Sequence, residues 1–290
     1  CPTGQALAAV DSVTSSDLLK PTDILRFKDK LVATELNANR LAFCDDLSLK
    51  KVEHFDPRQV GQKFHAPHFL SLSPWGTLLI SSGWGTSIVE ITDLNGTGWN
   101  EFHGVEKFRA PHGVCIDDQG WIYVGDSLNS RLVRFRDMDG GGWQVFKDVD
   151  KVVAYARQMV WKDGVLWVSN SYEQREGLNA GAGANVLKIE DFESRKAEII
   201  YARQDTNFTG ILPEPEHDRL LVGLWGAYQQ VYEVDLKSGQ GRPLRGTKRP
   251  GMGVPYGMFH DPVTGKRIVT YFGALTDKTD PGGLLILGEE

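Results

Sequence analysis

Short apolar runs separated by turn residues recur along the whole chain. The clearest copies begin at Ala66 and Ala110, an offset of 44 residues, and each opens with Ala-Pro-His. Each copy holds four apolar runs, and Gly, Asp and Asn stand between them. Such runs, bounded by turn residues, are typical of β-strands in short antiparallel sheets.

Weaker copies of this unit fill the rest of the chain. Together with the two clear copies, they begin near residues 21, 66, 110, 156, 208 and 255. A period of about 40 to 50 residues with four strands per unit is the signature of propeller blades. The pattern predicts an all-β chain, a six-bladed β-propeller with four-stranded antiparallel blades, as one domain over residues 1–290.

The last unit supplies only three strands before the chain stops, near residues 258–260, 267–271 and 284–287. Residues 6–13 have strand-like composition and precede the first unit. We therefore expect this N-terminal strand to complete the last blade as its outer strand and to close the ring.

One motif within the units resembles a known family. The segment Asp126-Ser127-Leu128-Asn129-Ser130-Arg131-Leu132 resembles the NHL repeat, and Asn37-Ala38-Asn39-Arg40-Leu41 is similar. The resemblance implies a β-propeller but no particular activity, since NHL-like propellers include lyases, hydrolases and interaction platforms.

Alignment of the units places one residue of each innermost strand at the same level of the central axis. These residues are Thr22, His68, His112, Arg157, Thr209 and Tyr256. Imidazole, guanidinium and phenol groups can hold an anion or move a proton. His68, His112, Arg157 and Tyr256 are therefore the catalytic candidates. The alternative for the histidines is a structural role, tying the inner strand to the next blade.

Further candidates surround this ring. Trp84 and Trp225 each follow a second strand as Trp-Gly, where a loop emerges and an indole can stack on a sugar. The fourth unit carries a long insertion, residues 172–185, at the same point. The predicted ligand-binding residues are Thr22, Asp23, His65, Gln158, Asn207, Thr209, Trp84 and Trp225.

A metal site is only weakly indicated by these residues. Two histidines without a third ligand fall short of a catalytic zinc site, so no tightly bound transition metal is expected. A divalent cation at the axial channel stays open as an alternative, with Asp23, Asn170 and Asn207 as the oxygen ligands.

The net charge and the first residue of the chain limit the classes of partner and the location that we expect. A formal net charge of −6 and the lack of a long Lys/Arg run argue against nucleic acid. No run of apolar residues is long enough to span a membrane as a helix. Cys1, followed by small polar residues, looks like the lipid-bearing first residue of a processed bacterial lipoprotein. We therefore expect a periplasmic or extracellular protein, anchored to the membrane only through lipidation of Cys1, with an unlipidated Cys1 as the alternative.

Two functions remain open from the sequence. The first is a cell-envelope or secreted NHL-like propeller that binds a small polar or anionic ligand, a glycan or a protein at the axial mouth and rim loops. The alternative is a propeller enzyme, lyase-like or lactonase/hydrolase-like, that uses the His, Arg and Tyr side chains. The layout resembles the peptidyl-hydroxyglycine lyases, which employ arginine and tyrosine, but their three-histidine metal set is not recovered here.

Overall fold

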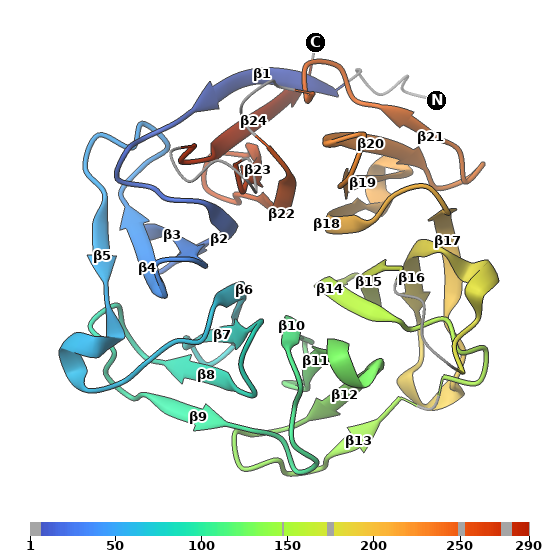
Figure 1. Ribbon diagram of the computed structural model, residues 1–290, viewed down its shortest axis with the longest axis horizontal. Helices are drawn as coiled ribbons and strands as arrows, with labels where there is room; N and C mark the ends of the chain where they lie inside the picture. The colour runs from blue at the N-terminus through green and yellow to red at the C-terminus, as the bar shows by residue number, and fades with distance from the viewer. Residues whose placement is uncertain (1–6, 147, 173–176, 249–252, 274–279, 290) are drawn as a thin grey trace.

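The strands lie in a ring of small sheets around a central axis (Figure 1). The computed structural model describes residues 7–146, 148–172, 177–248, 253–273 and 280–289. Within these ranges, six four-stranded antiparallel sheets are formed, and in five of them the strands follow the chain outward from the inner strand. The chain is thus a six-bladed β-propeller, which confirms the fold predicted from the repeats.

The blades have the following strands. Blade 1 contains β2 (Pro21–Phe27), β3 (Lys30–Glu35), β4 (Arg40–Cys44) and β5 (Glu53–Phe55). Blade 2 contains β6 (Pro67–Leu72), β7 (Leu78–Ser82), β8 (Ile88–Ile91) and β9 (Asn100–Phe102). Blade 3 contains β10 (Pro111–Ile116), β11 (Ile122–Asp126), β12 (Arg131–Phe135) and β13 (Gln144–Val145). Blade 4 contains β14 (Tyr155–Lys162), β15 (Val165–Ser171), β16 (Ala184–Ile189) and β17 (Glu198–Arg203). Blade 5 contains β18 (Phe208–Glu214), β19 (Arg219–Leu224), β20 (Gln230–Asp235) and β21 (Gly241–Pro243). Blade 6 contains β22 (Pro255–His260), β23 (Arg267–Tyr271), β24 (Gly283–Glu289) and β1 (Leu7–Val13).

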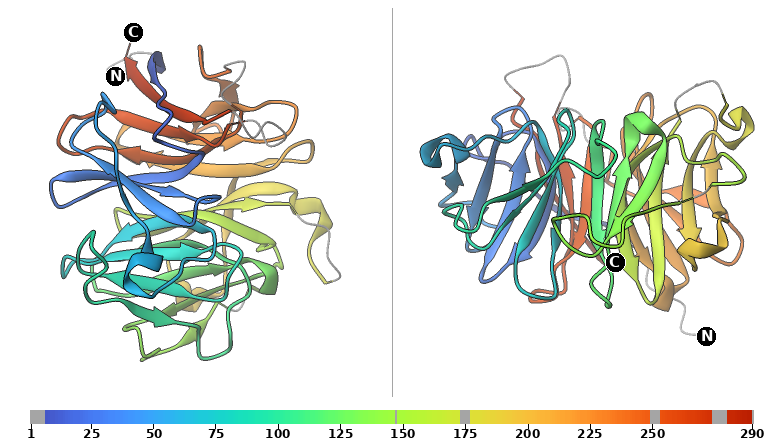
Figure 2. Two further views of the ribbon diagram at one scale, coloured as in Figure 1. Left: turned by 60° about the vertical axis from the view of Figure 1, so that its left-hand side comes forward. Right: turned by 90° about the horizontal axis from the view of Figure 1, so that it is seen from below.

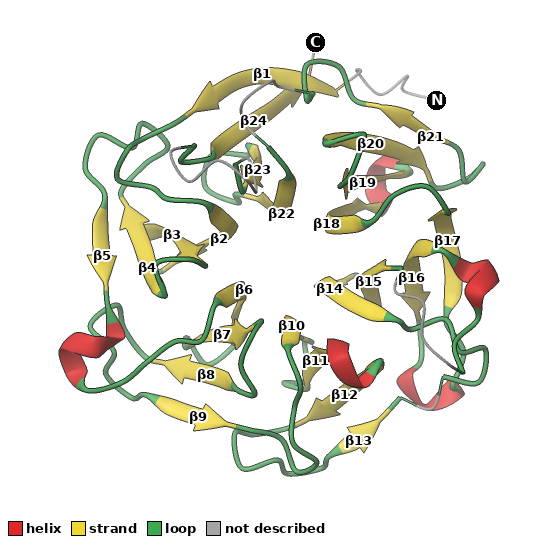
Figure 3. Cartoon of the chain, in the orientation of Figure 1, coloured by secondary structure: helices red, strands yellow, loops and turns green. Residues whose placement is uncertain are grey.

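Short 3₁₀ helices connect some of these strands, as Figure 3 shows in red. They are η1 (Pro57–Val60), η2 (Ser127–Asn129), η3 (Ala180–Ala182), η4 (Phe192–Ser194) and η5 (Pro215–His217). None of the helices in the described ranges is long and apolar enough to cross a membrane.

The ring closes through the N-terminal strand. β1 pairs antiparallel with β24, from Leu7 opposite Glu289 to Val13 opposite Leu284. It forms the outermost strand of blade 6, beside the C-terminal strand in Figure 1. The predicted closure is confirmed over residues 7–13, and Ala6 lies outside the described residues. One blade therefore joins the two ends of the chain.

Most of the hydrophobic core lies between neighbouring blades. The buried cluster between blades 2 and 3, for example, joins Leu79 and Ile88 to Val114 and Val133. Corresponding clusters join the other adjacent pairs around the ring. A single twisted sheet cannot bury both faces, so each blade depends on both neighbours. The side view in Figure 2 shows the blades packed face to face around the axis.

Side-chain hydroxyls of blades 1 to 5 form hydrogen bonds to the inner strand of the next blade. Thr34 Oγ1 in blade 1 donates to the His68 carbonyl of blade 2 at 2.9 Å. Ser127 Oγ of blade 3 donates to the Ala156 carbonyl of blade 4 at 2.6 Å. These bonds satisfy inner-strand carbonyls and fix the rotation of one blade against the next.

The NHL-like motif has a structural role in this fold. Asp126, at the end of β11, accepts hydrogen bonds from Asn129 Nδ2 and from Arg131 Nε, both at 2.7 Å. Glu35 and Arg40 form the corresponding ion pair in blade 1. The carboxylate thus holds the turn between the second and third strands of a blade.

Candidate functional site

A pocket of about 280 Å³ opens at one mouth of the central channel. We call it the axial pocket. Its lining comes from the first residues of inner strands, from the residue before β22 and from the loops after second strands: Leu36, Asn37, His68, Trp84, Tyr155, Arg157, Trp225, Val254, Tyr256 and Phe272. Three of the four predicted catalytic residues therefore line one cavity, although they come from three different blades.

The two Ala-Pro-His turns share a geometry that determines the state of their histidines. Ala66 and Ala110 adopt left-handed backbone conformations, with φ of 53° and 52°. The imidazole then folds back, so that His68 Nδ1 donates to the Ala66 carbonyl at 3.0 Å and His112 Nδ1 to the Ala110 carbonyl at 2.9 Å. Because a carbonyl only accepts, Nδ1 carries the proton in both rings and Nε2 carries the lone pair.

The two histidines lie side by side, and only one Nε2 has a partner among the described residues. Their ring centroids are 4.3 Å apart. The Tyr155 hydroxyl donates to His112 Nε2 at 3.2 Å. His68 Nε2 accepts no hydrogen bond from the described part of the chain, and His68 belongs to the pocket lining.

Burial keeps both imidazoles neutral. It lowers the pKa of His68 to about 3, and the nearby positive charge of Arg157 acts in the same direction. The pKa of His112 lies well below its usual value because of burial and because of His68 and Arg157. Both rings are thus hydrogen-bond acceptors at neutral pH and weak bases.

Arg157 is the positive charge of the axial pocket. Its Nη1 donates to the Tyr256 hydroxyl at 2.7 Å, and its Nε donates to Ser171 Oγ at 2.9 Å. No carboxylate within the described ranges pairs with this guanidinium. Burial raises the pKa of the Tyr256 phenol, and Arg157 opposes that rise. The arginine thus brings an uncompensated charge to a half-buried position.

Aromatic rings form the walls around this charge. The Arg157 guanidinium lies 4.9 Å from the Tyr155 ring centroid and 5.3 Å from that of Trp225. Trp84 is 69% exposed at the rim, and its ring centroid is 6.4 Å from that of His68. Indole rings at a pocket rim offer flat surfaces for a ligand.

Gly83 leaves space for the His68 imidazole in the axial pocket. A Cβ on Gly83 would lie 2.0 Å from His68 Nδ1. The residue before Trp84 therefore has to be glycine for the His68 imidazole to occupy its observed position.

Two predicted ligand-binding residues are not available to a ligand. Thr22 Oγ1 bonds to Thr34 Oγ1 at 2.8 Å and donates to the His68 carbonyl at 3.0 Å. Thr209 Oγ1 donates to the Pro255 carbonyl at 2.6 Å. Both residues are fully buried between blades. A threonine side chain is too short to reach past the neighbouring inner strand into the axial pocket. The two hydroxyls bond to backbone carbonyls of the next blade instead.

Asp23 and Gln158 lie below the ring rather than beside it. Asp23 Oδ2 accepts the Leu70 N–H at 2.8 Å. Gln158 crosses to blades 5 and 6, since its Oε1 accepts the Ile211 N–H at 2.9 Å and its Nε2 donates to the Met258 carbonyl at 2.9 Å. Both are buried and join inner strands across the channel. They form a plug beneath the axial pocket.

The remaining predicted residues lie at the rim. His65 is exposed close to Gly85, outside the axial pocket lining. Asn207 lines a neighbouring cavity together with Trp225. The insertion runs from the end of β15 at Ser171 to the start of β16 at Ala184, and its described part contains η3. Residues 173–176 of the insertion lie outside the described residues.

The described residues offer no complete metal site. Nowhere among them do three His, Cys, Asp or Glu side chains gather closely enough to hold a metal ion. In the axial pocket, His112 Nε2 is already bonded to Tyr155, and Asp23 lies in the plug below. These donors do not fit the divalent cation considered as an alternative from the sequence.

Tyr155 belongs to the site but was not among the residues predicted from the sequence. This residue places a phenol in the axial pocket and bonds to His112. Its only signal was a tyrosine one position before the start of the fourth unit, where the other units carry Lys20, His65, Arg109, Asn207 and Val254.

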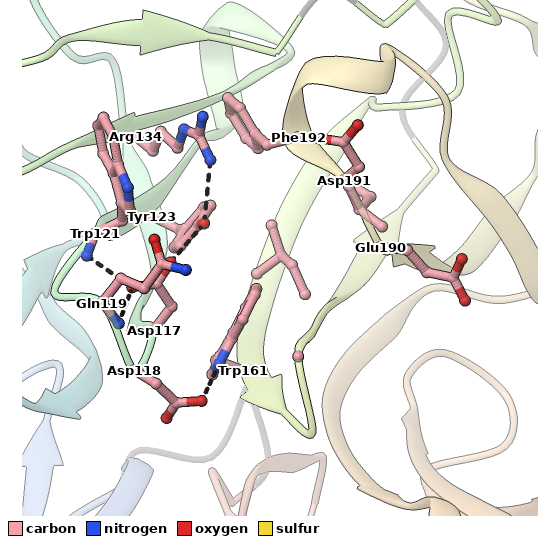
Figure 4. Close-up of a pocket in the computed structure, with 13 residues that line it drawn as sticks. Asp117, Asp118, Gln119, Trp121, Tyr123, Arg134, Trp161, Glu190, Asp191 and Phe192 are labelled. Carbon is pink, nitrogen blue, oxygen red and sulfur yellow. Dashed lines mark hydrogen bonds between the residues drawn. The ribbon is translucent and has the colours of Figure 1, made fainter.

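Two other cavities are larger than the axial pocket. One, of about 350 Å³, lies at the far ends of the inner strands, below the plug, and is lined mostly by apolar side chains. The other, also about 350 Å³, lies between blades 3 and 4 (Figure 4). There Asp117 Oδ2 accepts from Tyr123, Tyr123 stacks on Trp161, and Arg134 lies 4.4 Å from the Trp121 ring. Arg134 of this cavity is paired with Glu193 at 2.6 Å, whereas Arg157 has no carboxylate partner among the described residues.

Comparisons with known proteins agree with this architecture. Residues 108–135, which include the Asp126–Arg131 turn, match the NHL repeat family. The chain is a six-bladed β-propeller with an NHL repeat. No curated protein matches this NHL-type propeller in sequence.

Solved structures share its fold at low sequence identity. Virginiamycin B lyase from Staphylococcus aureus is 15% identical, with a TM-score of 0.61 over 98% of this chain and 99% of its own. A gluconolactonase from Xanthomonas campestris is 13% identical, with a TM-score of 0.64 over 100% of this chain and 99% of its own. A chain of a nidogen–laminin complex is 13% identical, with a TM-score of 0.64 over 83% of this chain and 84% of its own. At such identities the likeness concerns the fold, which serves lyases, lactonases and binding proteins alike.

Proposed function

We propose that this NHL-type propeller binds a small carboxylate-bearing ligand in the axial pocket. The observation that carries the proposal is the Arg157 guanidinium, half-buried and without a carboxylate partner among the described residues. A guanidinium in a partly dry pocket pairs strongly with a carboxylate, because two parallel hydrogen bonds match its fork.

The surroundings of Arg157 suit recognition of such a ligand. His68 Nε2 can accept a hydrogen bond from a ligand hydroxyl, since its imidazole is neutral at physiological pH. Trp84 and Trp225 provide apolar surfaces on two sides. A few polar groups within an aromatic cavity is the usual composition of a small-molecule site.

Titration with small carboxylates tests this proposal. Isothermal calorimetry with acetate, benzoate and glucuronate should detect binding, and Arg157→Gln should weaken it by at least about tenfold, the loss of one charge-assisted pair. Arg136→Gln is the matched control, because Arg136 is exposed and lies over Trp121, outside the axial pocket. Equal affinities in the Arg157 variant and the native protein would refute the proposal.

A lyase or lactonase activity in the same pocket is the second candidate function. It is supported by the 2.7 Å bond between Arg157 and the Tyr256 hydroxyl, because an adjacent cation stabilises a phenolate. In this role Arg157 holds a carbonyl or carboxylate while Tyr256 moves a proton. The low pKa of His68 makes it a poor base at neutral pH, which favours binding over histidine-based catalysis.

Turnover distinguishes the two candidates. Hydrolysis of simple aldonolactones and elimination from β-substituted carboxylates should be followed in the native protein and in Tyr256→Phe. Turnover that is lost in Tyr256→Phe while carboxylate binding is retained would establish the enzyme.

The location at the cell envelope belongs to the proposal as well. It depends on Cys1, which lies outside the described residues. Mass spectrometry of the protein isolated from its native cells should detect a diacylglycerol-modified Cys1, and a free Cys1 in the aqueous fraction would contradict anchoring.

A further inference from the structure

Trp225 is a wall shared by two cavities. On one side lies the axial pocket, about 280 Å³, and on the other lies a cavity of about 300 Å³ between blades 4 and 5. We call the second cavity the blade 4–5 pocket. Besides Trp225, its lining consists of Tyr172, Gln204, Asp205, Thr206, Asn207 and Gly226. Each cavity alone is small for a ligand site, whereas roughly 300 to 1,000 Å³ is usual. Together they suit a ligand with two rings.

Asn207 gives the blade 4–5 pocket an unsatisfied polar group. Its backbone carbonyl accepts the Trp225 N–H at 2.8 Å, which holds it next to the shared wall. Its side-chain oxygen Oδ1 is shielded from solvent and has no hydrogen-bond partner among the described residues. Rotation about the last side-chain bond exchanges oxygen and nitrogen, so this amide can meet a ligand hydroxyl with either atom. A hydroxyl-bearing ligand would satisfy a group that the protein leaves unpaired.

The two cavities differ in charge. The axial pocket contains the Arg157 guanidinium, which has no carboxylate partner among the described residues. The blade 4–5 pocket contains Asp205, an ionised carboxylate that is already paired with Arg203 through two hydrogen bonds of 2.8 Å. A carboxylate accepts hydrogen bonds from sugar hydroxyls and repels a second anion. The pair of cavities therefore matches a ligand with one anionic end and one neutral, hydroxylated end.

We propose that the ligand is an acidic disaccharide, free or at the end of a longer chain. Its uronic carboxylate lies on Arg157, and its neutral sugar lies across Trp225, beside Asn207 and Asp205. The proposal rests on the carboxylate binding at Arg157 described above. It adds a second subsite and an orientation of the ligand, with the carboxylate in the axial pocket and the neutral sugar in the blade 4–5 pocket. The exposed indole of Trp84 and the shared indole of Trp225 are the stacking surfaces that sugar rings use.

Calorimetry with four probes tests it on the full chain. The probes are glucuronic acid, glucuronic acid linked to a neutral sugar, a diuronide and the neutral disaccharide cellobiose. The mixed disaccharide should bind about tenfold more tightly than glucuronic acid, for one or two added hydrogen bonds. The diuronide should bind more weakly than the mixed disaccharide, because its second carboxylate meets Asp205 while the neighbouring Arg203 is already paired with that residue. Cellobiose should bind most weakly.

Variants assign these differences to residues. Asn207→Ala should weaken the mixed disaccharide by about three- to tenfold and leave glucuronic acid unchanged. Asp205→Asn should reduce the discrimination against the diuronide. Asn95→Ala is the matched control, because Asn95 is exposed in an outer turn of blade 2. Circular dichroism of each variant checks that the fold is intact.

The outcomes separate this inference from the proposed function. If the mixed disaccharide binds no more tightly than glucuronic acid, or if Asn207→Ala weakens both equally, the second subsite is refuted while carboxylate binding stands. If simple carboxylates bind through Arg157 and no uronide does, the sugar class is refuted. If no carboxylate binds, or Arg157→Gln has no effect, both proposals fail.

Discussion

Replacing Asp23 by asparagine should make the protein more resistant to alkaline pH. Asp23 is buried in the axial plug, where Oδ2 accepts the Leu70 N–H at 2.8 Å and Oδ1 has no hydrogen-bond partner in the described part of the chain. Burial raises the pKa of this carboxyl to about 8, although backbone N–H groups of Leu70 and Ile24 oppose the rise. The folded protein therefore holds Asp23 protonated at neutral pH. Asparagine has nearly the same shape and keeps an oxygen for Leu70.

The sign of the pH dependence follows from the two states of the chain. In the unfolded chain Asp23 loses its proton near pH 3.8, whereas in the folded chain it does so near pH 8. The folded state is thus most favoured below about pH 4, and that advantage is lost as the pH rises to about 8. A difference of about four pKa units corresponds to a ceiling of roughly 5 kcal/mol in the free energy of unfolding. Asparagine does not ionise, so this loss should be absent in Asp23→Asn.

Urea denaturation followed by tryptophan fluorescence measures the effect at pH 5, 7 and 8.5. The native protein should lose stability over this range more steeply than Asp23→Asn, and the variant should be the more stable at pH 8.5. Asp261→Asn is the contrasting control, since hydrogen bonds from Arg26 hold the pKa of Asp261 at about 2. Because Asp261 is ionised and paired in the folded state, its replacement should destabilise the protein at neutral pH. Parallel pH profiles of the native protein and Asp23→Asn would refute the assignment of a neutral Asp23.

Three further predictions concern the ring and the axial pocket. Gly83→Ala should cost about 1 to 3 kcal/mol in urea denaturation and weaken carboxylate binding, because the new Cβ displaces the His68 imidazole; unchanged binding would contradict this. Deleting residues 1–13 should lower the melting temperature by on the order of 10 °C and promote aggregation seen by light scattering, since it exposes the β24 edge; an unchanged melting temperature would argue against ring closure by β1. Glu214→Gln should cost roughly 3 to 5 kcal/mol by thermal or urea unfolding, because Glu214 joins the buried Arg219 and Arg267 at 2.5 Å each; a loss below about 1 kcal/mol would show that the ion pairs are not needed.

The propeller could be predicted because its signal is repeated. Turn glycines such as Gly76 and Gly120 recur at the same place in successive units, and both adopt positive φ in the structure. The apolar runs between them predict strands wherever they occur. A missing strand at one end and a spare strand at the other end of the chain then require closure by residues 6–13. All of this depends on local pattern and chain order, which a sequence contains.

The side-chain directions at the axis could not be predicted in the same way. Each of the six inner strands has an irregular register near its start, between Pro21 and Ile24 in β2, for example, and between Ala156 and Met159 in β14. A bulge breaks the alternation of inward and outward side chains and turns individual residues to new directions. Equivalent positions in the repeat therefore have different neighbours.

The sequence by itself determined the architecture, the ring closure and the approximate level at which the candidate side chains of the inner strands meet. Only the tertiary structure decided which of them face the axial pocket. His68, Arg157 and Tyr256 are long enough to reach the cavity, whereas the hydroxyls of Thr22 and Thr209 bond to backbone carbonyls of the next blade. Strand patterns arise from neighbours along the chain, but the contents of a pocket depend on packing between blades that are distant in sequence.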